Sequence, residues 1–329
     1  MKERKEAAIS SLDAEELRRI LLQGRKALEA KVEAINALNV FPVPDGDTGT
    51  NMLLTMKALE EEVARATDTP SSQLVATMAR GALMGARGNS GIILAQFFQG
   101  LAKGLDGKDN FDCHALALAL AEASTAAYKA VGNPVEGTML TVIREISEAT
   151  QAQAVTKTDV LELWETMCQA ARKAVARTPT LLPVLREAGV VDAGGQGLSV
   201  LLEGALKGLR GEEPDGIELT VPEIDTGQHG VSETFIQATE EELYGYCTQF
   251  LLQGEALDTD AMREKMQSLA TSTVVIGGDT LVKVHVHTPD PGPVLSYAVT
   301  QGILSQVSIV NMDEQHQEFA AARRRERKL

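Results

Sequence analysis

Two hydrophobic patterns divide this chain. From Asp13 to about Gly208, apolar residues recur at helical spacing, and Asp13 followed by Glu16 forms a capping box at the start. Further helices are expected to begin near Asn51, Ser71, Ser90, Asp112, Val135, Lys157 and Gly195. The β-branched alternation typical of strands is missing from this half. The pattern therefore predicts an all-α bundle or barrel with loops at its ends.

After a polar linker at 209–216, the pattern changes. Strands are predicted at 217–221, 243–252, 271–277, 280–288 and 303–310, and helices at 258–269 and 291–301. From residue 243 the order is β-α-β-β-α-β, which is typical of a ferredoxin-like α+β sandwich. We therefore expect domains at 1–209 and 217–312. Residues 313–329 end in a basic run and are predicted to be a tail or linker, helical and solvated near its end.

Net charge, cysteine content and the lengths of the apolar runs restrict the classes of protein to which this chain could belong. The 329 residues carry a formal net charge of −15, which argues against nonspecific nucleic-acid binding. Three scattered cysteines show no disulfide framework and fit a reducing compartment. The charged N-terminus is not followed by a signal-peptide core, and no apolar run reaches membrane-spanning length. We expect a cytoplasmic protein without an integral membrane segment.

Residues 39–52 carry the densest chemistry. Prolines favour extended residues before them and glycines permit sharp turns, so Asp45 and Asp47 can converge on one point. Converging carboxylates repel each other unless a cation joins them, and oxygen ligands suit Mg²⁺. Three neighbouring polar side chains are candidates for holding phosphate: Thr48, Thr50 and Asn51. A simple turn between two helices would use the same residue types.

Three further loops, at 85–91, 132–140 and 189–197, combine small residues with the start of a helix. Free N–H groups at a helix start attract anions, and small residues let a phosphate approach the backbone. Neither a P-loop nor a Rossmann sequence is present. Alternate loops of an up-and-down bundle share one end, which predicts that the four loops converge. Each loop is also compatible with an ordinary helix connection.

Three of these segments, 36–52, 85–91 and 191–197, resemble the motifs of bacterial fatty acid kinase catalytic subunits. The helical half is similar to the nucleotide-binding L subunit (DhaL-like) of dihydroxyacetone kinases. The resemblance implies an eight-helix barrel with ATP or ADP and two Mg²⁺ ions at one end. The implied magnesium ligands are Asn39, Asp45 and Asp47, although the dihydroxyacetone kinases have Asp at the position of Asn39.

The resemblance also implies the remaining site residues. Asp45 and Asp47 would be catalytic through the metal, and Arg87 is a candidate for added charge stabilisation, although a solvated arginine would look the same. The implied nucleotide contacts are Thr48, Thr50, Asn51, Asn89, Ser90, Gly91, Thr138, Met139, Asp192 and Gly194. The implied reaction transfers phosphate from ATP to a fatty-acid carboxylate, giving an acyl phosphate for phospholipid synthesis. Such a transfer needs positioning and charge neutralisation more than a general base, which fits the absence of histidine from the four loops.

The run 281–288 alternates, with its valines on the core face and Lys283, His285 and His287 on the other. Two histidines at i and i+2 can chelate a metal, and Cys247 on another predicted strand would complete a ligand set typical of zinc. A solvent-facing strand with two histidines is the alternative. The resemblance implies Zn²⁺ on Cys247, His285 and His287. We expect a structural or docking role for it, because the nucleotide loops lie in the other half.

The expected partners are a separate fatty-acid-binding protein (FakB-like) and a second copy of the chain in a homodimer. The family's C-terminal domain, which helps engage the carrier, is absent from this sequence, and we expect nucleotide binding without it. Two other functions stay open. One is a dihydroxyacetone-kinase-like subunit that retains ADP and receives phosphate from a phosphocarrier protein. The other is a nucleotide-sensing scaffold without turnover.

Overall fold

The computed structural model describes residues 8–67, 69–222, 231, 233–239 and 242–326. Residues 1–7 of the predicted first domain and residues 327–329 of the predicted tail lie outside the described residues. Within the described part, the helical half has eight long helices: α1 Ala14–Glu29, α3 Thr48–Arg65, α4 Ser71–Gly85, α5 Gly88–Gly104, α6 Cys113–Ala130, α7 Met139–Ala154, α8 Val160–Leu181 and α10 Ala193–Arg210. Two short helices, α2 Val32–Asn36 and α9 Pro183–Ala188, lie between long ones.

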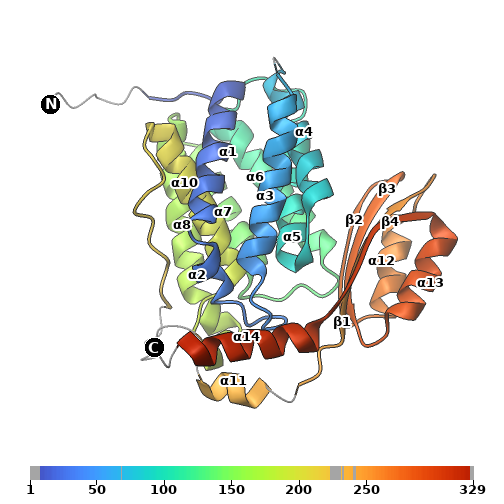
Figure 1. Cartoon of the computed structure of the whole chain (residues 1–329). Coiled ribbons are helices and arrows are strands. Elements are labelled where there is room, and N and C mark those ends of the chain that lie inside the picture. The colour runs from blue at the N-terminus through green and yellow to red at the C-terminus, as the bar shows by residue number, and fades with distance from the viewer. Residues whose placement is uncertain (1–7, 68, 223–230, 232, 240–241, 327–329) are drawn as a thin grey trace.

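The eight long helices form a closed ring. Each packs on the next along the chain, and α10 packs on both α8 and α1 (Figure 1). Small residues allow the closest approaches: a Cβ on Gly100 of α5 would lie 2.3 Å from the Cα of Ala123 on α6. The predicted capping box is present, because Asp13 accepts from the N–H of Glu16 at 2.9 Å. The predicted eight-helix barrel is confirmed.

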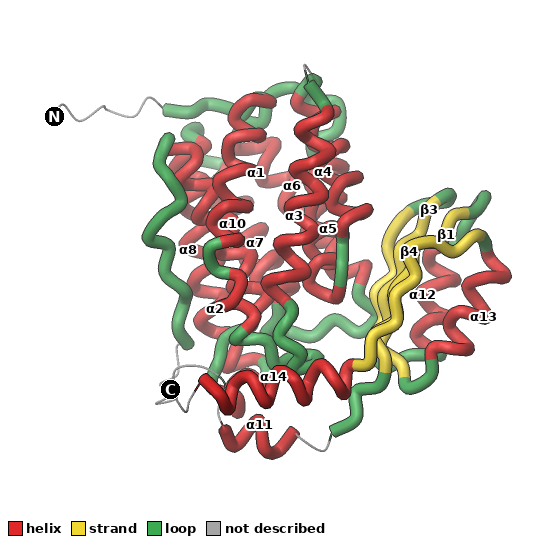
Figure 2. The backbone as a smooth tube through the Cα atoms, in the orientation of Figure 1, coloured by secondary structure: helices red, strands yellow, loops and turns green. Residues whose placement is uncertain are grey.

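The second half contains β1 Tyr246–Gln253, α12 Thr259–Gln267, β2 Ser272–Gly277, β3 Leu281–Thr288, α13 Pro291–Gln301 and β4 Ile303–Asn311. The strand order is β2-β3-β1-β4, and each adjacent pair is antiparallel. This arrangement confirms the predicted ferredoxin-like α+β sandwich. Helices α12 and α13 cover the sheet face that points away from the ring (Figure 2). The valines of β3 are fully buried on that side, as predicted.

One predicted strand is wrong. Residues 217–221 have no regular secondary structure and join no strand ladder in the described part of the chain. Ile217 is instead buried against the core of the ring, and the Thr220 N–H donates to the Gln196 side chain at 2.9 Å. Ile217 therefore packs against the ring, whereas Val221 at the end of the run is 64% exposed.

The segment predicted as a basic tail or linker, helical and solvated near its end, forms α14, Met312–Glu326, which begins directly after β4. Met312, His316 and Ala320 are 0%, 2% and 3% exposed, so the helix has a buried face at i, i+4 and i+8 spacing. That face packs with α9, with α11 Glu233–Thr239 and with the loop that leads to Asp45. Figure 1 shows α14 crossing one end of the ring, with α11 beside it.

The sheet is attached to the ring along both of its edges. At the β2 edge, the Gly132 N–H donates to the Thr273 carbonyl at 3.0 Å, and Val131 bridges to Val274. At the other edge, β4 continues into α14. The uncovered face of the sheet is thus turned towards the loop end of the ring (Figure 2). No helix in the described ranges is long and apolar enough to cross a membrane.

Candidate active site

A cavity of about 1000 Å³ lies between the loop end of the ring and the uncovered sheet face. All four predicted loops reach it. The predicted site residues that line it are Asn39, Asp45, Asp47, Thr48, Thr50, Asn51, Arg87, Asn89, Ser90, Thr138, Met139, Asp192, Gly194, Cys247, His285 and His287. Gly91 does not line it. Its N–H already donates to the Arg87 carbonyl at 3.1 Å, and a Cβ there would lie 2.6 Å from the Thr55 hydroxyl, so it is a helix-packing position.

Four helices begin at this cavity: α3, α5, α7 and α10. The first residues of a helix have N–H groups without helical partners, and the helix dipole adds positive potential there. Four such ends around one space create a strong local attraction for an anion, although the protein as a whole carries a formal charge of −15. A polyphosphate is the kind of anion that can use several helix ends at once.

Residues 39–47, which we call the carboxylate loop, place Asp45 and Asp47 on either side of Gly46, whose φ is +67°. Asp47 precedes α3 directly, and its carboxylate makes no capping hydrogen bond. Burial raises the pKa of Asp45 well above its ordinary value, and the charge of Asp47 adds to the rise. Burial also raises the pKa of Asp47. A divalent cation between the two carboxylates would offset both effects, so the pair fits Mg²⁺.

Hydrogen bonds from the Asn39 side chain stabilise the carboxylate loop. Its side-chain Nδ2 donates to the Val43 carbonyl at 2.6 Å and to the Asp45 carboxylate at 3.0 Å. Its Oδ1 accepts from the Thr48 N–H at 3.2 Å and from the Thr48 hydroxyl. In this arrangement Asn39 supports Asp45 through its nitrogen, while its oxygen faces the start of α3.

The turn between α4 and α5 brings polar groups to the same space. Gly88 has a φ of +58°, and a Cβ there would lie 2.4 Å from the Asn51 amide, so the glycine lets the starts of α3 and α5 meet. The Asn89 Oδ1 is buried with no hydrogen-bond partner in the described residues. Rotating this amide by half a turn would present its NH₂ group, which suits an oxyanion. Arg87 is exposed at the cavity rim.

The other two ring loops are shaped by helix caps. Thr138 caps α7 by accepting from the Leu140 N–H at 3.3 Å. Asp192 caps α10 by accepting from the Gly195 N–H at 2.7 Å, and burial raises the pKa of Asp192 to about 6. Gly194 leaves room for the Met139 side chain, because a Cβ added to Gly194 would lie 3.2 Å from the Met139 Cβ. These residues form a compact wall opposite the sheet.

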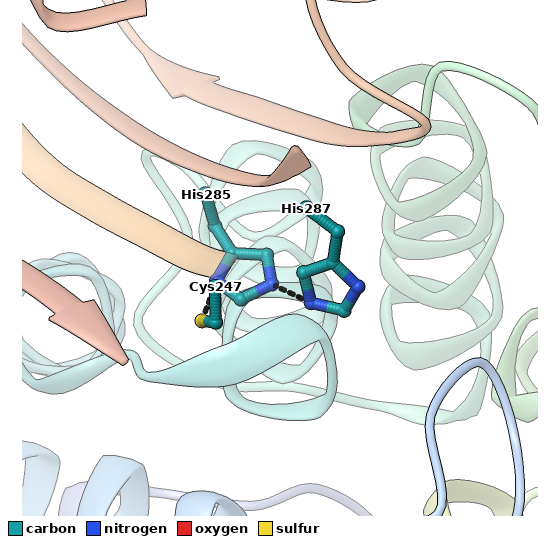
Figure 3. Close-up of side chains that lie close together, drawn as sticks. All are labelled: Cys247, His285 and His287. Atoms are coloured by element: carbon teal, nitrogen blue, oxygen red, sulfur yellow. Dashed lines mark hydrogen bonds between the residues drawn. The ribbon is translucent and has the colours of Figure 1, made fainter. Parts of the chain in front are cut away.

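The sheet contributes the cluster Cys247, His285 and His287 (Figure 3). Cys247 lies directly opposite His287 in the ladder between β1 and β3. The Cys247 Sγ is 3.7 Å from His285 Nδ1, and the two Nε2 atoms of the histidines are 3.1 Å apart. One potential ligand atom from each residue lies within 4.8 Å of the others. Strand β3 is buried on both faces, so the alternative of a solvent-facing strand with two histidines is wrong.

Electrostatics favour uncharged histidines in this cluster. Burial lowers the pKa of His287 to about 4, and it lowers the pKa of His285 well below its ordinary value. Burial raises the pKa of Cys247 to about 12, with further contributions from the charges of Asp47 and Asp45. Neutral imidazoles offer lone pairs to a metal, and a bound metal stabilises a thiolate. The donor set therefore fits zinc.

The structure corrects one part of the sequence argument. Cys247 and the two histidines line the same cavity as Asp45 and Asp47, so the expected separation of the metal candidate from the nucleotide loops is wrong. Several residues of the second half that also line the cavity were not predicted from the sequence: Tyr244, Tyr246, Gln249, Thr271, Ser308, Asp313 and Gln315. Alternation along β1 places Gln249 on the face of Cys247, but only the docking of the sheet shows that this face closes the cavity.

Comparison with known proteins agrees with this arrangement. Residues 42–207 match the DAK2 domain family, and residues 243–319 match the FakA-like middle domain of fatty acid kinases. The first match covers half of the chain, which therefore belongs to the DAK2 domain family. The combination of the two domains is that of FakA-type fatty acid kinase subunits.

Among curated proteins, uncharacterized proteins of Staphylococcus epidermidis (strain RP62A) and Staphylococcus aureus (strain USA300) are each 39% identical over 322 residues. These matches cover 94% of this chain and 57% of each relative, so the chain spans little more than half of their length. Among solved structures, the dihydroxyacetone kinase from C. freundii with AMP-PNP and Mg²⁺ matches with a TM-score of 0.45 and 19% identity, over 63% of this chain and 36% of that one. Its native form matches over the same shares with a TM-score of 0.43 and 22% identity.

Proposed function

We propose that this chain is the ATP-binding part of a kinase that phosphorylates a fatty-acid carboxylate. The observation that carries the proposal is the meeting of Asp45 and Asp47 with four helix N-termini in one cavity. A magnesium–nucleotide complex needs both features, because the carboxylates bind the cation and the helix ends bind phosphates. Membership of the DAK2 domain family supports the same reading.

In this proposal Asp45 and Asp47 hold two Mg²⁺ ions, which neutralise phosphate charge when bound. Asn39 becomes a third magnesium ligand only if its side-chain oxygen gives up the hydrogen bond from the Thr48 N–H. Phosphate contacts come from Thr48, Thr50, Asn51, Asn89 and Ser90, and Arg87 adds a positive charge at the rim. The base and ribose lie against Thr138, Met139, Asp192 and Gly194.

The acceptor is a fatty acid presented by a separate fatty-acid-binding protein. A carboxylate oxygen of the acid forms a bond to the γ-phosphorus, and the bond from that phosphorus to the bridging oxygen of ADP breaks. The acceptor is already an anion, so no proton has to leave it and no general base is required. The products are an acyl phosphate and ADP. The match to the FakA-like middle domain supports this acceptor.

Zinc is the metal proposed for Cys247, His285 and His287. Their three donor atoms come from β1 and β3, so a bound ion would fix the two central strands of the sheet wall beside the reacting groups. This position supports a role in shaping the acceptor side of the cavity.

A homodimer is part of the proposal. β4 is an edge strand with exposed apolar side chains at Ile303, Val307 and Ile309. An exposed apolar edge is a typical site for a second protein surface. Light scattering on the purified chain tests the dimer: a monomer mass at micromolar concentration would remove it.

The first experiment is calorimetric titration of ATP with and without Mg²⁺ on the parent, on Asp45→Asn and on Asp106→Asn. Asp106 is an exposed carboxylate between α5 and α6 and serves as the matched control. We expect Mg²⁺-dependent binding in the parent and the control and its loss in Asp45→Asn. Absence of nucleotide binding in the parent would overturn the proposal.

The second experiment supplies ATP and a fatty-acid-loaded carrier protein and follows ADP together with hydroxylamine-trapped acyl phosphate. Formation of both in equal amounts is expected. ADP that stays bound and is phosphorylated by a phosphocarrier would indicate the dihydroxyacetone-kinase-like reading. Nucleotide binding without transfer to the carrier-bound acid would indicate a sensing scaffold.

A further inference from the structure

Helix α14 touches the carboxylate loop on both sides of Asp45. On one side, the ring of His316, which is 2% exposed, places Nδ1 at 3.1 Å from the Pro44 carbonyl. On the other side, a Cβ on Gly46 would lie 2.5 Å from a ring carbon of Phe319, so that ring rests on the glycine. Pro44 and Gly46 are the two residues that flank Asp45 in the sequence.

His316 ties the loop to a second element. Its Nε2 is 3.1 Å from the carbonyl of Thr239, at the end of α11. Both neighbours are carbonyl oxygens, which only accept hydrogen bonds, so a ring nitrogen that carries a proton donates to the carbonyl beside it. The Tyr244 ring packs edge-on against the imidazole, with the two ring centroids 5.2 Å apart.

The same helix is joined to the opposite wall of the cavity. It follows β4 without an intervening residue, and Asp313 in its first turn accepts from the Tyr244 N–H at 2.6 Å, just before β1. Asp313 and Gln315 line the cavity themselves. α14 therefore connects the sheet that carries Cys247 to the loop that carries Asp45.

We propose that α14 positions the carboxylate loop, with His316 and Phe319 as the positioning residues. His316 holds the peptide before Asp45 and Phe319 holds the one after it, which keeps the Asp45 carboxylate turned into the cavity beside Asp47. The inference rests on the proposed function, in which these carboxylates bind the magnesium ions of the nucleotide. Neither positioning residue touches the nucleotide in this proposal.

The test uses two substitutions that each keep one of the two bonds. The amide nitrogen of asparagine occupies the place of Nδ1, so His316→Asn retains the bond to Pro44. The amide nitrogen of glutamine reaches the place of Nε2, so His316→Gln retains only the bond to Thr239. Each variant removes one of the two polar contacts of the buried ring, so a similar loss of stability is expected in both. Gln317→Ala, at the neighbouring exposed position of α14, is the control.

The decisive readout is the Mg²⁺ concentration that gives half-maximal ATP binding in calorimetry. We expect it to rise about tenfold in His316→Gln, which corresponds to about 1.4 kcal/mol. It should stay near the parent value in His316→Asn and Gln317→Ala. An equal change in the Asn and Gln variants, or no change in either, would show that His316 is only structural and would overturn the proposal.

Gly46 tests the Phe319 contact separately. Gly46→Ala and Gly107→Ala both place alanine at a positive φ, +67° and +69°, but a Cβ on Gly107 has no atom within 4 Å. Backbone strain is thus matched. Gly46→Ala should raise the Mg²⁺ concentration needed for half-maximal ATP binding. Adding Phe319→Leu to the Gly46→Ala chain should bring that concentration part of the way back to the parent value. Equal behaviour of the two alanine variants would remove Phe319 from the proposal.

A spectroscopic readout separates this inference from the proposed function. In the full chain labelled with ¹⁵N-histidine, His316 should show a hydrogen-bonded ring N–H signal with or without nucleotide, and the signal should vanish in His316→Asn. A His316 ring without a hydrogen-bonded N–H would overturn the proposed connection between α14 and the carboxylate loop. If the parent binds no nucleotide, the proposed function fails by itself, and the ring signals together with the stabilities of the Gly46 and Gly107 variants decide the contact.

Discussion

Asp192 offers a quantitative test of the electrostatics of the cavity. Its carboxylate is buried at the start of α10 and accepts from the Gly195 N–H at 2.7 Å. Burial raises its pKa from 3.8 to about 6, so between these two values the folded protein binds more protons at this site than the unfolded chain does. The free energy of unfolding therefore falls as the pH rises from about 4 to about 6. The difference between the two pKa values corresponds to about 3 kcal/mol lost at neutral pH.

Asp192→Asn removes the charge and keeps a residue type that caps helices equally well. The variant should lack this fall, so at pH 7 its free energy of unfolding should exceed the parent's by up to about 3 kcal/mol. Near pH 4 the difference should be small. Asp112→Asn is the matched control, because Asp112 caps α6 in the same way, accepting from the Ala115 N–H at 2.8 Å, but stays exposed to water.

Urea unfolding across this pH range measures the difference. The sole tryptophan, Trp164, reports directly on the region, since its indole N–H on α8 donates to the Leu202 carbonyl of α10 at 3.0 Å. A difference between Asp192→Asn and the parent that is the same at about pH 4.5 and at pH 7 would refute the reasoning. Lower stability of the variant at pH 7 would refute it more strongly, because the cap would then outweigh desolvation.

Two further predictions concern the sheet. Cys247→Ser should lower the zinc content measured by elemental analysis. The control Cys113→Ser, which changes a buried thiol in the helical ring, should leave the zinc content unchanged. Equal zinc in the parent and both variants would end the assignment of Cys247 as a zinc ligand. Burial lowers the pKa of Lys283 to about 8 from 10.5, so the unfolded chain binds more protons between these values and the free energy of unfolding should rise with pH across that range. Lys283→Met should abolish that rise in urea unfolding, and an unchanged rise would show that the ammonium is hydrated.

The features that could be predicted from the sequence are those with local signals. The capping box at Asp13 places the start of α1, and the alternation in 281–288 places β3 and its core-facing valines. The carboxylate loop could be recognised because proline, glycine and aspartate together restrict the backbone over a few residues. Even the convergence of the four ring loops follows from a local rule, since consecutive antiparallel helices alternate their ends.

What the sequence did not predict depends on packing between distant segments. α14 was expected to be solvated because its basic end dominates its composition, while its buried face consists of only a few positions, among them His316 and Ala320. The run 217–221 has strand-forming residues but no partner to pair with in the described part of the chain. Closure of the cavity by the sheet depends on contacts such as Lys283 Nζ to the Met84 carbonyl, at 3.3 Å, which join residues 199 positions apart.

The attachment of the sheet along both edges has a mechanical consequence. A lid that is fixed along one edge can swing about that edge, whereas this one is fixed at the β2 edge by Gly132 and at the β4 edge through α14. Swinging open about either edge requires release of the other. We therefore expect ligands to exchange through the open sides of the cavity while the sheet stays in place, unless the α14 contacts break first. Rotation of the two halves is thus limited jointly by the Gly132 hydrogen bond at the β2 edge and by the α14 contacts beside Asp45.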